Sequence, residues 1–365
     1  MITWRPKKLD VYITKKFIGT FFVAILLIIG IVIIFDLSEK VDDFVQKKAP
    51  MEAILVDYYL NFIPYFMNMF SPIFVFITVI FFTSRMAANS EIIAALSCGV
   101  SFHRLMVPYI FSAAVIAIFS LSLNLWVIPP ANAVRQEFEN TYVKKRSTLA
   151  ESNVHYQINP GEYVYVQSFS KWNNTAYKFT LSSIQGKKLL SKLEAESAAW
   201  DSTARCWKLK KYFIRSFDEG LLVDKIKSGM FKDTVINLTV EDFYRKANSV
   251  QELTIGELDK LIDTQKMRGD ADVKYSLIEK HNRYSLPFSA FILTLIGVSL
   301  SSKKKRGGLG WNMAIGIALS FSYILFMRFS EMFVHAGTLP PGIALWLPNL
   351  IYAIVAAVLY RIAPK

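Results

Sequence analysis

The stretch FIGTFFVAILLIIGIVIIF, residues 17–35, carries no charged side chain and is interrupted by Gly19 and Gly30. A helix needs about 20 apolar residues to cross the hydrocarbon core of a bilayer, and glycine is tolerated in such helices. Similar stretches lie before and after a long polar region. They cover residues 58–83, 105–128, 285–300, 311–334 and 342–362. The sequence therefore predicts an α-helical polytopic membrane protein with six transmembrane helices, three on each side of an inserted domain.

Prolines predict where two of these helices deviate from a regular, continuous α-helix. Pro64 and Pro72 lie inside the second span, and proline removes a backbone donor from a helix, so a kinked or broken helix is expected there. The third span is expected to stop at Pro129 and Pro130.

Basic residues in the short loops predict the orientation, because Lys and Arg are retained in the cytoplasm. They precede the first span, flank the loop after the second span and fill the turn between the fourth and fifth. They are Arg5, Lys7, Lys8, Lys15, Lys16, Arg85, Arg104, Lys303, Lys304, Lys305 and Arg306. Both chain termini are therefore expected in the cytoplasm, and the central domain on the opposite side.

The central region changes from continuous apolar runs to short alternating ones. Residues 163–166, 177–181, 207–214 and 235–238 alternate in this way between turn residues, which is typical of β-strands. Many short strands indicate a sandwich, a jelly roll or an open barrel. The aromatic residues of this domain are more often core than ligand-binding.

A helical pattern follows the strands. Thr254 and Glu257 fit a capping box, Gly269 breaks the run, and a second helix carries Glu279 and Arg283 four residues apart into the fourth span. The predicted division has four parts. They are residues 1–130 with three spans and a loop helix near 89–98, 131–253 as a periplasmic β-jelly-roll-like domain, 254–284 as a helical connector, and 285–365 with three spans.

Composition excludes several functions. The formal net charge of +13 is divided between loop anchors and a mixed-charge domain, without the basic stripe typical of nucleic-acid binding. The topology separates Cys98 from Cys206, and no spacing of ligands predicts a metal. Phosphate-binding loops and hydrolase motifs are absent from the sequence. We expect no cofactor, no metal and no catalytic residue in this chain.

Polar residues near the membrane have two open interpretations. Arg328 and Glu331 are three residues apart on the fifth span, where they form either a structural ion pair or a contact with a lipid head group. Asn61, Asn68 and Asn124 are expected to hydrogen-bond between helices. No series of acidic residues crosses the bilayer, which argues against an ion-coupled carrier.

The cytoplasmic loop between spans two and three contains a short helical pattern. Residues 90–97, SEIIAALS, follow a possible N-cap at Asn89 or Ser90 and precede Gly99, which favours a helix end. This helix either lies at the membrane interface or docks into a cytoplasmic partner, with Glu91 available to a basic residue. The pattern alone leaves both interpretations open.

Four segments carry a resemblance to a known family. They are NSEIIAALSCGVS at 89–101, LEAESAAWD at 193–201 followed by WKL at 207–209, EKHNRYSLP at 279–287 and WLPN at 346–349. In this order and topology the chain resembles the LptF/LptG permeases. The resemblance implies a subunit of an ATP-driven exporter that extracts lipopolysaccharide from the inner membrane of Gram-negative bacteria and passes it to a periplasmic bridge.

The resemblance also implies partners and residue roles. The partners would be a cytoplasmic ATPase dimer, a second six-span permease paralogue, a periplasmic bridge protein with a similar β domain, and lipopolysaccharide. Glu91 would pair with a basic residue of the ATPase. The residues implied to dock the loop helix are Ile92, Ala95, Leu96 and Gly99, and those implied near the lipid are Lys40, Arg135, Arg328 and Glu331.

The sequence departs from the family pattern in two places. Asp36 is an acid where a base would attract phosphates better, and the usual basic residue before Gly99 is absent. Two alternatives remain. A lipoprotein-release type ABC permease is disfavoured by the 3+3 arrangement, and a non-transporting scaffold that anchors a periplasmic bridge would have no need of a coupling helix.

Overall fold

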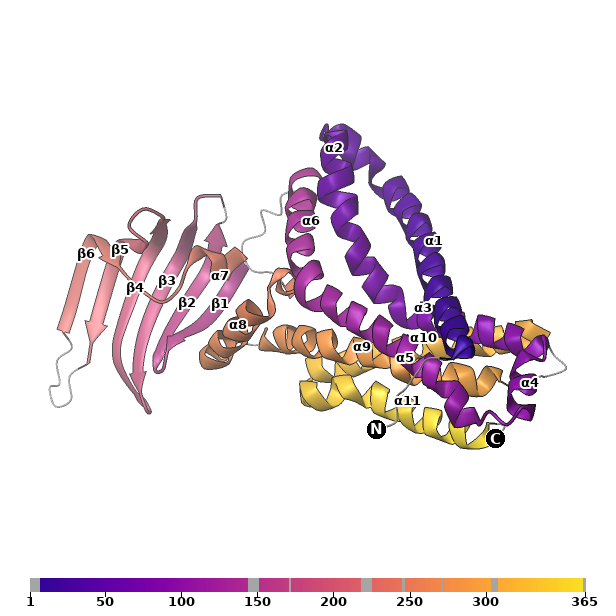
Figure 1. Ribbon diagram of the computed structural model, residues 1–365. Coiled ribbons are helices and arrows are strands. Elements are labelled where there is room, and N and C mark those ends of the chain that lie inside the picture. The colour runs from indigo at the N-terminus through magenta and orange to yellow at the C-terminus, as the bar shows by residue number, and fades with distance from the viewer. Residues whose placement is uncertain are drawn as a thin grey trace. The chain divides into compact units, whose positions relative to one another are not determined.

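The computed structural model describes residues 7–143, 151–170, 172–217, 225–244, 247–270, 272–302 and 308–363. The chain forms two compact units, whose elements are labelled in Figure 1. The helical unit comprises Met1–Val143, Gln251–Ile255 and Leu277–Lys365. The sheet unit comprises Lys144–Val250 and Gly256–Ser276. Helices that are long and apolar enough to cross a membrane, with a sheet inserted between them, confirm the predicted fold.

The first membrane helix is much longer than its apolar stretch. Helix α1 runs Lys8–Gln46, 39 residues, which at 1.5 Å per residue is about 58 Å. The hydrocarbon core is only about 30 Å thick, so the helix extends beyond it even when tilted. Its polar ends therefore remain helical, and they carry charged side chains at defined positions along the helix.

The second membrane helix contains an irregular turn, but not at its prolines. It begins with α2 (Met51–Ala53), passes through a π-helix, η1 (Ile54–Tyr59), and continues as α3 (Leu60–Ala88). Both predicted proline positions lie inside α3, which is unbroken. Of the expected kinked or broken helix, the break is therefore wrong, and the irregular turn precedes the prolines, where Leu60 N–H donates to Leu55 O.

The third membrane helix does not stop at Pro129 and Pro130. Helix α5 (Phe102–Ser122) continues through a second π-helix, η2 (Leu123–Val127), into α6 (Ile128–Tyr142). The prolines are the second and third residues of α6, in its first turn, where a missing backbone N–H is tolerated. The expected end is therefore wrong, because the π-helical turn lets the chain pass two prolines without leaving the helix.

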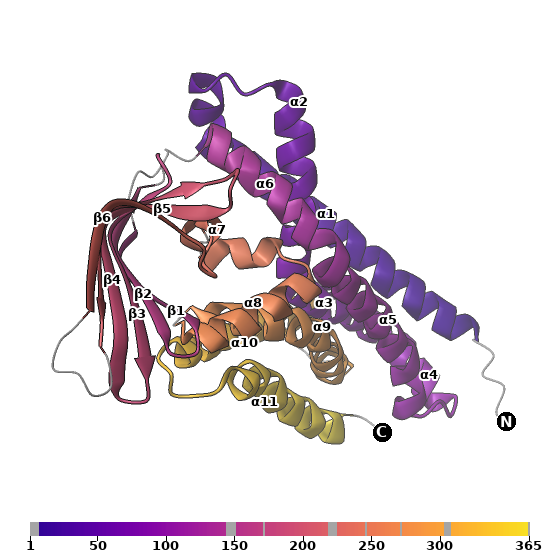
Figure 2. The same cartoon turned by 90° about the vertical axis from the view of Figure 1, so that its left-hand side faces the viewer.

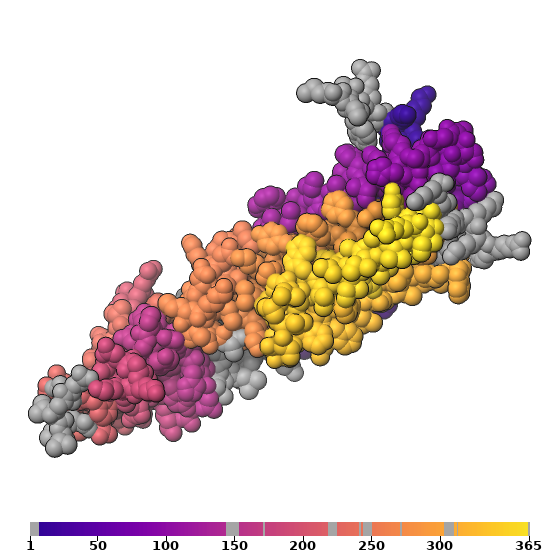
Figure 3. All heavy atoms as spheres, turned by 90° about the horizontal axis from the view of Figure 1, so that it is seen from below, coloured from indigo at the N-terminus to yellow at the C-terminus, as the bar shows by residue number. Residues whose placement is uncertain are grey.

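Three more membrane helices complete the helical unit. They are α9 (Val273–Ser301), α10 (Gly308–His335) and α11 (Pro341–Ile362). Figure 3 shows α11, in yellow, on the face turned to the viewer. With the three N-terminal helices they make the six predicted spans. The short helix α4 (Glu91–Ser97) lies in the loop between the second and third of them.

Aromatic rings pack the helical unit where α1, α3 and α5 meet. The ring of Phe82 lies 5.8 Å from that of Phe17 and stacks on Tyr109 at 5.3 Å. Outside this core α1 is poorly covered, since only 22% of its most apolar window is buried. Apolar side chains exposed on a membrane helix face lipid or another membrane protein.

The sheet unit contains one six-stranded antiparallel sheet whose strands follow sequence order. Figure 2 shows that this sheet is curved. The strands are β1 (Glu151–Asn159), β2 (Glu162–Ser170), β3 (Thr175–Gln185), β4 (Lys188–Asp201), β5 (Cys206–Ser216) and β6 (Lys225–Thr234). The predicted β domain is therefore a curved meander, in which every connection joins neighbouring strands.

Aromatic side chains fill the core of the sheet unit. Helix α7 (Val240–Tyr244) places Phe243 against Phe169, with ring centroids 4.3 Å apart, and Trp207 is fully buried beside them. Trp172 is instead 87% exposed. The expectation that the aromatics form the core holds for Trp207 but not for Trp172.

Residues 235–238 do not form the predicted strand. They are irregular, and they pack over the core: Leu238 is buried and its carbonyl accepts a 2.8 Å hydrogen bond from Trp207 Nε1. The alternating pattern reflected burial on one side of the segment. Its backbone binds side chains instead of a neighbouring strand.

The predicted helical connector is two helices. The 3₁₀ turn η3 (Ala247–Glu252) precedes α8 (Ile255–Arg268), and Gly269, with φ +65°, separates α8 from α9. Within the sheet unit, Arg268 ties α8 to the segment after β6, through Asp242 at 2.8 Å and the Asn237 carbonyl at 3.0 Å. Glu279 and Arg283, four residues apart on α9, form an ion pair at 2.9 Å.

Candidate functional site

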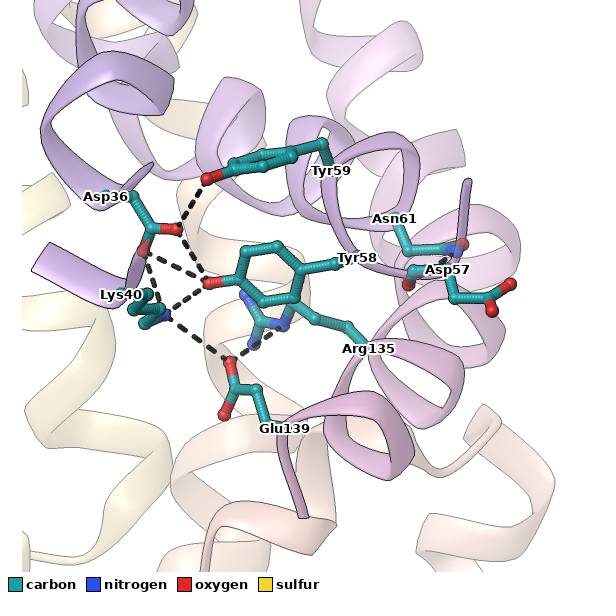
Figure 4. Close-up of polar contacts among 8 residues, drawn as sticks. All are labelled: Asp36, Lys40, Asp57, Tyr58, Tyr59, Asn61, Arg135 and Glu139. Carbon is teal, nitrogen blue, oxygen red and sulfur yellow. Dashed lines mark hydrogen bonds and ion pairs between the residues drawn. The ribbon is translucent and has the colours of Figure 1, made fainter. Parts of the chain in front are cut away.

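A cluster of charged and phenolic side chains joins three segments of the helical unit (Figure 4). Helix α1, the π-helix η1 and helix α6 each supply two of its members. We call it the Lys40 cluster, and its members are Asp36, Lys40, Tyr58, Tyr59, Arg135 and Glu139.

Helical spacing explains how the sequence builds this cluster. Asp36 and Lys40 are four residues apart on α1, and Arg135 and Glu139 are four apart on α6, so each pair shares one helix face. Tyr58 lies in the π-helical turn, a type of irregularity that is frequent at functional sites. All three segments direct polar side chains to one place.

Lys40 is the centre of the hydrogen-bond network. Its Nζ lies 2.8 Å from Asp36 Oδ1 and donates to the Tyr58 hydroxyl. That hydroxyl in turn donates to Asp36 Oδ2 at 2.9 Å. Tyr59 adds a longer bond to the same oxygen, at 3.4 Å. Asp36 is thus the acceptor that holds α1 against η1.

Glu139 extends the network to Arg135. Its Oε1 lies 4.0 Å from Lys40 Nζ and 3.9 Å from Arg135 Nε. The Arg135 guanidinium also lies over the ring of Tyr65, 4.9 Å from the centroid, a cation–π arrangement. Its Nε is buried and has no hydrogen bond to any residue that the structure describes. Arg135 is therefore held by charge and ring contact, with a donor left over.

The four charges of the Lys40 cluster balance. Two carboxylates face two basic groups, and the charged side chains are only 11–20% exposed. Phe44, Phe62 and Phe138 pack around Tyr58 and bury its ring. Loss of one member of such a mostly buried pair should cost at most about 3–5 kcal/mol, because the other charge is left uncompensated. A ligand with its own negative charge would have to replace Asp36 or Glu139 as the partner of a base.

Helix α4 is fixed at both ends by residues in left-handed conformations. Ser90 before it has φ 61° and Gly99 after it has φ +83°. Gly99 N–H donates to Leu96 O and Val100 N–H to Ala95 O, the two bonds of a Schellman motif. The predicted helix and its end at Gly99 are confirmed.

One side of α4 is anchored and the other is free for contact. Ile92 is fully buried, whereas Ile93 is 44% exposed. The Glu91 carboxylate accepts hydrogen bonds from Asn89 Nδ2 at 3.2 Å and from the Tyr12 hydroxyl at 3.4 Å. Glu91 is therefore positioned near the start of α1, in contacts long enough to be exchanged.

A tighter contact holds the same region. The Arg104 guanidinium donates two hydrogen bonds to Asp10, at 2.7 Å to Oδ1 and 2.6 Å to Oδ2. Asp10 lies in the first turn of α1, and Arg104 lies in the first turn of α5, just after the loop that carries α4. The loop is thus fixed to α1 at its C-terminal end.

Residues 11–362 match the model of the family described as lipopolysaccharide export system permease LptF/LptG. The chain belongs to the LptF/LptG family. Among curated proteins no relative matches it. The six apolar helices and the family together make this LptF/LptG chain a multi-pass inner-membrane protein of lipopolysaccharide export.

The residues that the sequence singled out in this LptF/LptG permease fall into separate places. Lys40 and Arg135 are brought together through Glu139. Arg328 and Glu331 form an ion pair of their own, at 2.9 Å on α10, and Glu331 also accepts a 3.0 Å hydrogen bond from Asn282. The ion-pair interpretation is therefore confirmed, while the mostly exposed Arg328 side chain stays available for other contacts.

Asparagines in the permease behave in two ways. Asn68 donates to Asn124 at 2.8 Å and accepts from Ser120 at 2.5 Å, so α3 is bonded to α5 and η2 as expected. Asn61 instead donates to the carbonyls of Val56 and Asp57 in its own helix. The expectation of an interhelical bond is wrong for Asn61, because the π-helix leaves those carbonyls within its reach.

Sequence reasoning missed most partners of the predicted residues. Tyr58, Glu139, Asp10 and Arg104 were not recognised as members of these contacts. Glu139 had a usable signal, its i,i+4 spacing to Arg135. The others are distant in sequence from their partners and carried none.

The described part of the permease, residues 7–143 and the later ranges with their gaps, contains no group of three His, Cys, Asp or Glu residues that could hold a metal ion. Cys98 is exposed and Cys206 is buried, and both are free thiols.

Proposed function

We propose that this chain is a permease subunit of an ATP-driven exporter that extracts lipopolysaccharide from the inner membrane and passes it to a periplasmic bridge. The observation that carries the proposal is α4, a helix capped at Gly99 and held by Ile92 in the loop between two spans of an LptF/LptG chain. A scaffold without transport would have no use for such a fixed, exposed helix.

Extraction of a lipid needs an external energy source. Each methylene moved from the bilayer into water costs about 0.8 kcal/mol, and a lipid with several acyl chains has dozens of them. The sequence has no phosphate-binding loop of its own. A cytoplasmic ATPase dimer is therefore the proposed source of energy, and this chain is proposed to have no enzymatic activity.

Helix α4 is the proposed contact with that ATPase. Glu91 would exchange its long hydrogen bond with Tyr12 for a basic residue of the partner. Ala95, Leu96 and Gly99 would form the rest of the contact, with Ile92 as the anchor inside this chain. Both termini and α4 would then lie in the cytoplasm, and the sheet unit in the periplasm.

The Lys40 cluster is the proposed site for the charged part of the lipid. Phosphate groups would compete with Asp36 and Glu139 for Lys40 and Arg135, since charge-assisted bonds to phosphate are strong. Arg328 and Glu331 remain candidates for a second contact with the lipid. The cluster is neutral in the described state, so binding would exchange one set of ion pairs for another.

A second six-span permease is the proposed neighbour in the membrane. Helix α1 leaves most of its apolar surface uncovered, which suits a partner helix or the acyl chains of the transported lipid. The sheet unit would pass the lipid to a periplasmic bridge protein with a similar β domain.

The first test is purification of the tagged full chain from its own membranes in mild detergent, with partner proteins and bound lipid identified by mass spectrometry. Recovery of an ATPase, a second six-span protein and lipopolysaccharide is expected. Recovery of the chain alone, or with periplasmic proteins only, would contradict the proposal and favour a scaffold.

Two variants make this test specific. Glu91→Ala and Glu91→Lys should lose the ATPase from the purified complex while the chain remains in the membrane. Ser97→Ala, an exposed change on the same helix, is the matched control and should retain it. Retention of the ATPase and normal export in both Glu91 variants would exclude Glu91 from the contact.

A further inference from the structure

A cavity of about 200 Å³ lies inside the helical unit, between α3, α6, α9 and α10. Its apolar wall includes Met69, Phe70, Ile324 and Met327. Its polar wall is formed by amide and charged side chains. They include Asn132, Asn282, Glu279, Arg283, Arg328 and Glu331.

The charged groups of the cavity are already paired. Arg283 binds Glu279 at 2.9 Å and donates to the Leu253 carbonyl, also at 2.9 Å. Arg328 binds Glu331 at 2.9 Å. The wall therefore carries two balanced ion pairs, and it offers no excess charge to an ionic ligand.

Two amide side chains are left with unused hydrogen-bonding groups. Asn132 is fully buried, and neither its Nδ2 nor its Oδ1 has a partner within the ranges that the structure describes. The buried Oδ1 of Asn282 also has none there, although its Nδ2 donates to Glu331. A buried polar group without a partner costs about 1–3 kcal/mol, so such groups usually serve a ligand or water.

These unused groups define the chemistry that would fit. Asn132 offers its NH2 group as donor and its oxygen as acceptor, and Asn282 offers a second acceptor oxygen. A hydroxyl or an amide meets both needs, whereas a phosphate or carboxylate supplies no proton for the acceptors. We propose that this cavity binds an uncharged hydroxyl- or amide-bearing part of an amphiphilic molecule, held by Asn132 and Asn282.

The volume limits how much of the molecule enters. Pockets that enclose drug-sized ligands measure about 300–1,000 Å³, and 200 Å³ corresponds to about seven water molecules in the liquid. The cavity therefore suits a single polar head or linkage with the beginning of an acyl chain. A whole multi-acyl lipid does not fit.

The cavity also adjoins the Lys40 cluster. Tyr65 lines the cavity and lies under the Arg135 guanidinium, so one side chain borders both sites. Two sources supply the proposed chemistry: an acylated amino sugar of the exported glycolipid, and the glycerol part of a bilayer lipid. Only the first source rests on the proposed export function, and the test separates the two.

The test uses the full chain in lipid nanodiscs and three probes, each with a photoreactive chain of the same twelve-carbon length. They are N-dodecanoylglucosamine, 1-dodecanoylglycerol and dodecyl phosphate. Cross-linked peptides are identified by mass spectrometry. We expect the uncharged probes to label α3 and α10 peptides at the cavity wall at least tenfold more than dodecyl phosphate does.

Two variants challenge the site itself. Asn132→Leu has nearly the same shape without donor or acceptor, and it should reduce labelling about tenfold while the thermal unfolding midpoint stays equal or rises. A structural asparagine would instead destabilise the chain when replaced. Met327→Trp fills the cavity from the apolar side and should abolish labelling independently. Asn61→Leu, outside the cavity, is the control and should label as the wild type does.

Each outcome has a clear meaning. Stronger labelling by the glucosamine probe supports the site with the exported glycolipid as its source, and stronger labelling by the glycerol probe supports it with a bilayer lipid. Equal labelling by all three probes, no labelling, or labelling unchanged in Asn132→Leu and Met327→Trp would overturn the proposal. None of these results depends on recovery of an ATPase, so failure here is distinguishable from failure of the export proposal.

Discussion

Asp10 and Arg104 join the first turns of α1 and α5 by two parallel hydrogen bonds of 2.7 and 2.6 Å. The Asp10 side chain is only 5% exposed. Because Arg104 directly follows the loop that carries α4, a movement of α4 would be passed to α1 through this pair. Bidentate Arg–carboxylate contacts are geometrically specific, which suits such a connection.

Breaking this pair should destabilise the permease and weaken the coupling between α4 and α1. Asp10→Asn removes the charge but keeps the shape, and we expect a loss of about 1–3 kcal/mol in the free energy of unfolding, because Arg104 is left partly buried and uncompensated. The fall is measured by thermal unfolding of the purified complex. Lipid-stimulated ATP hydrolysis should fall in the same variant.

The exchanged variant provides the control. Asp10→Arg combined with Arg104→Asp restores opposite charges, and it should recover part of the stability lost by either single change. Single variants that match the wild type in both stability and ATP hydrolysis would show that the contact neither stabilises the chain nor couples the two helices.

Gly99 should be needed for its backbone conformation. Its φ is +83°, and a Cβ built there meets no atom of this chain within 4 Å, so any effect of Gly99→Ala on the chain itself comes from the left-handed backbone. That conformation costs a non-glycine residue about 1–2 kcal/mol. We expect fraying of α4 and weaker retention of the ATPase, with little change in the global unfolding midpoint.

Replacing Gly99 by asparagine distinguishes the backbone explanation from a change in the contact surface. Gly99→Asn adds a larger side chain but tolerates the left-handed region, and it should retain more ATPase than Gly99→Ala does. The reverse order in a co-purification assay would mean that the space at Gly99, not its φ, matters to the partner.

Asp36 should set the affinity of the Lys40 cluster for phosphate. In Asp36→Asn, Lys40 keeps Tyr58 and Glu139 but loses its closest carboxylate, at 2.8 Å. A change of about 1 kcal/mol in competition for Lys40 corresponds to about fivefold tighter binding of a phosphorylated lipid. The measurement is the binding affinity for lipid A with and without phosphate. Only the affinity for the phosphorylated form should increase.

Tyr58→Phe is the companion variant. It removes the hydroxyl that links Lys40 to Asp36 and leaves every charge in place. We expect lower thermal stability and nearly unchanged preference between the two lipids. A similar gain in phosphate preference for Tyr58→Phe would show that loosening of the cluster, and not its charge, controls lipid binding.

The sequence predicted the membrane helices because a bilayer imposes a length and composition that local pattern records, as residues 17–35 illustrate. It failed at Pro129, where a π-helical turn from the preceding residues lets the helix continue. It also misread residues 235–238, whose alternation reflects packing over Trp207. At Pro129 an irregular helical turn determined the structure. At residues 235–238 a contact with a residue distant in sequence determined it.

The candidate sites show the same division between local features, which the sequence predicts, and distant contacts, which it does not. The helix that carries Glu91 and its end at Gly99 were predictable, because a short helix and its cap are local features. Lys40 and Arg135 were recognised only as bases, and the acids that neutralise them come from helix geometry and from another segment. Asn132 had no sequence signal, since an unpartnered buried amide is recognisable only once the neighbouring helices are in place.

The β4–β5 hairpin should lose protection at low pH through one carboxyl group. A hydrogen bond from the Lys208 ammonium, at 2.6 Å, and bonds from the Ala204 and Thr203 amides lower the pKa of Asp201 from 3.8 to about 2. A carboxyl whose pKa is lowered by folding adds stability above its ordinary value. That contribution falls progressively from pH 3.8 and is lost below about pH 2.

The same ion pair also sets the upper limit of the pH range in which it adds stability. Contact with Asp201 raises the pKa of Lys208 above its ordinary 10.5, so the contribution is complete below that pH and is lost as the pH rises through the raised value. Hydrogen exchange of hairpin peptides, compared between wild type and Asp201→Asn at each pH, measures the effect. The wild type should be better protected at pH 5–9, and the two should converge near pH 2. Asp233→Asn, on the cross-strand neighbour of Lys208, is a control of equal charge change: it should keep the loss of protection near pH 2, and it should change only the alkaline limit, because Asp233 also attracts Lys208. An unchanged difference at pH 2 would show that Asp201 stabilises the turn without its charge.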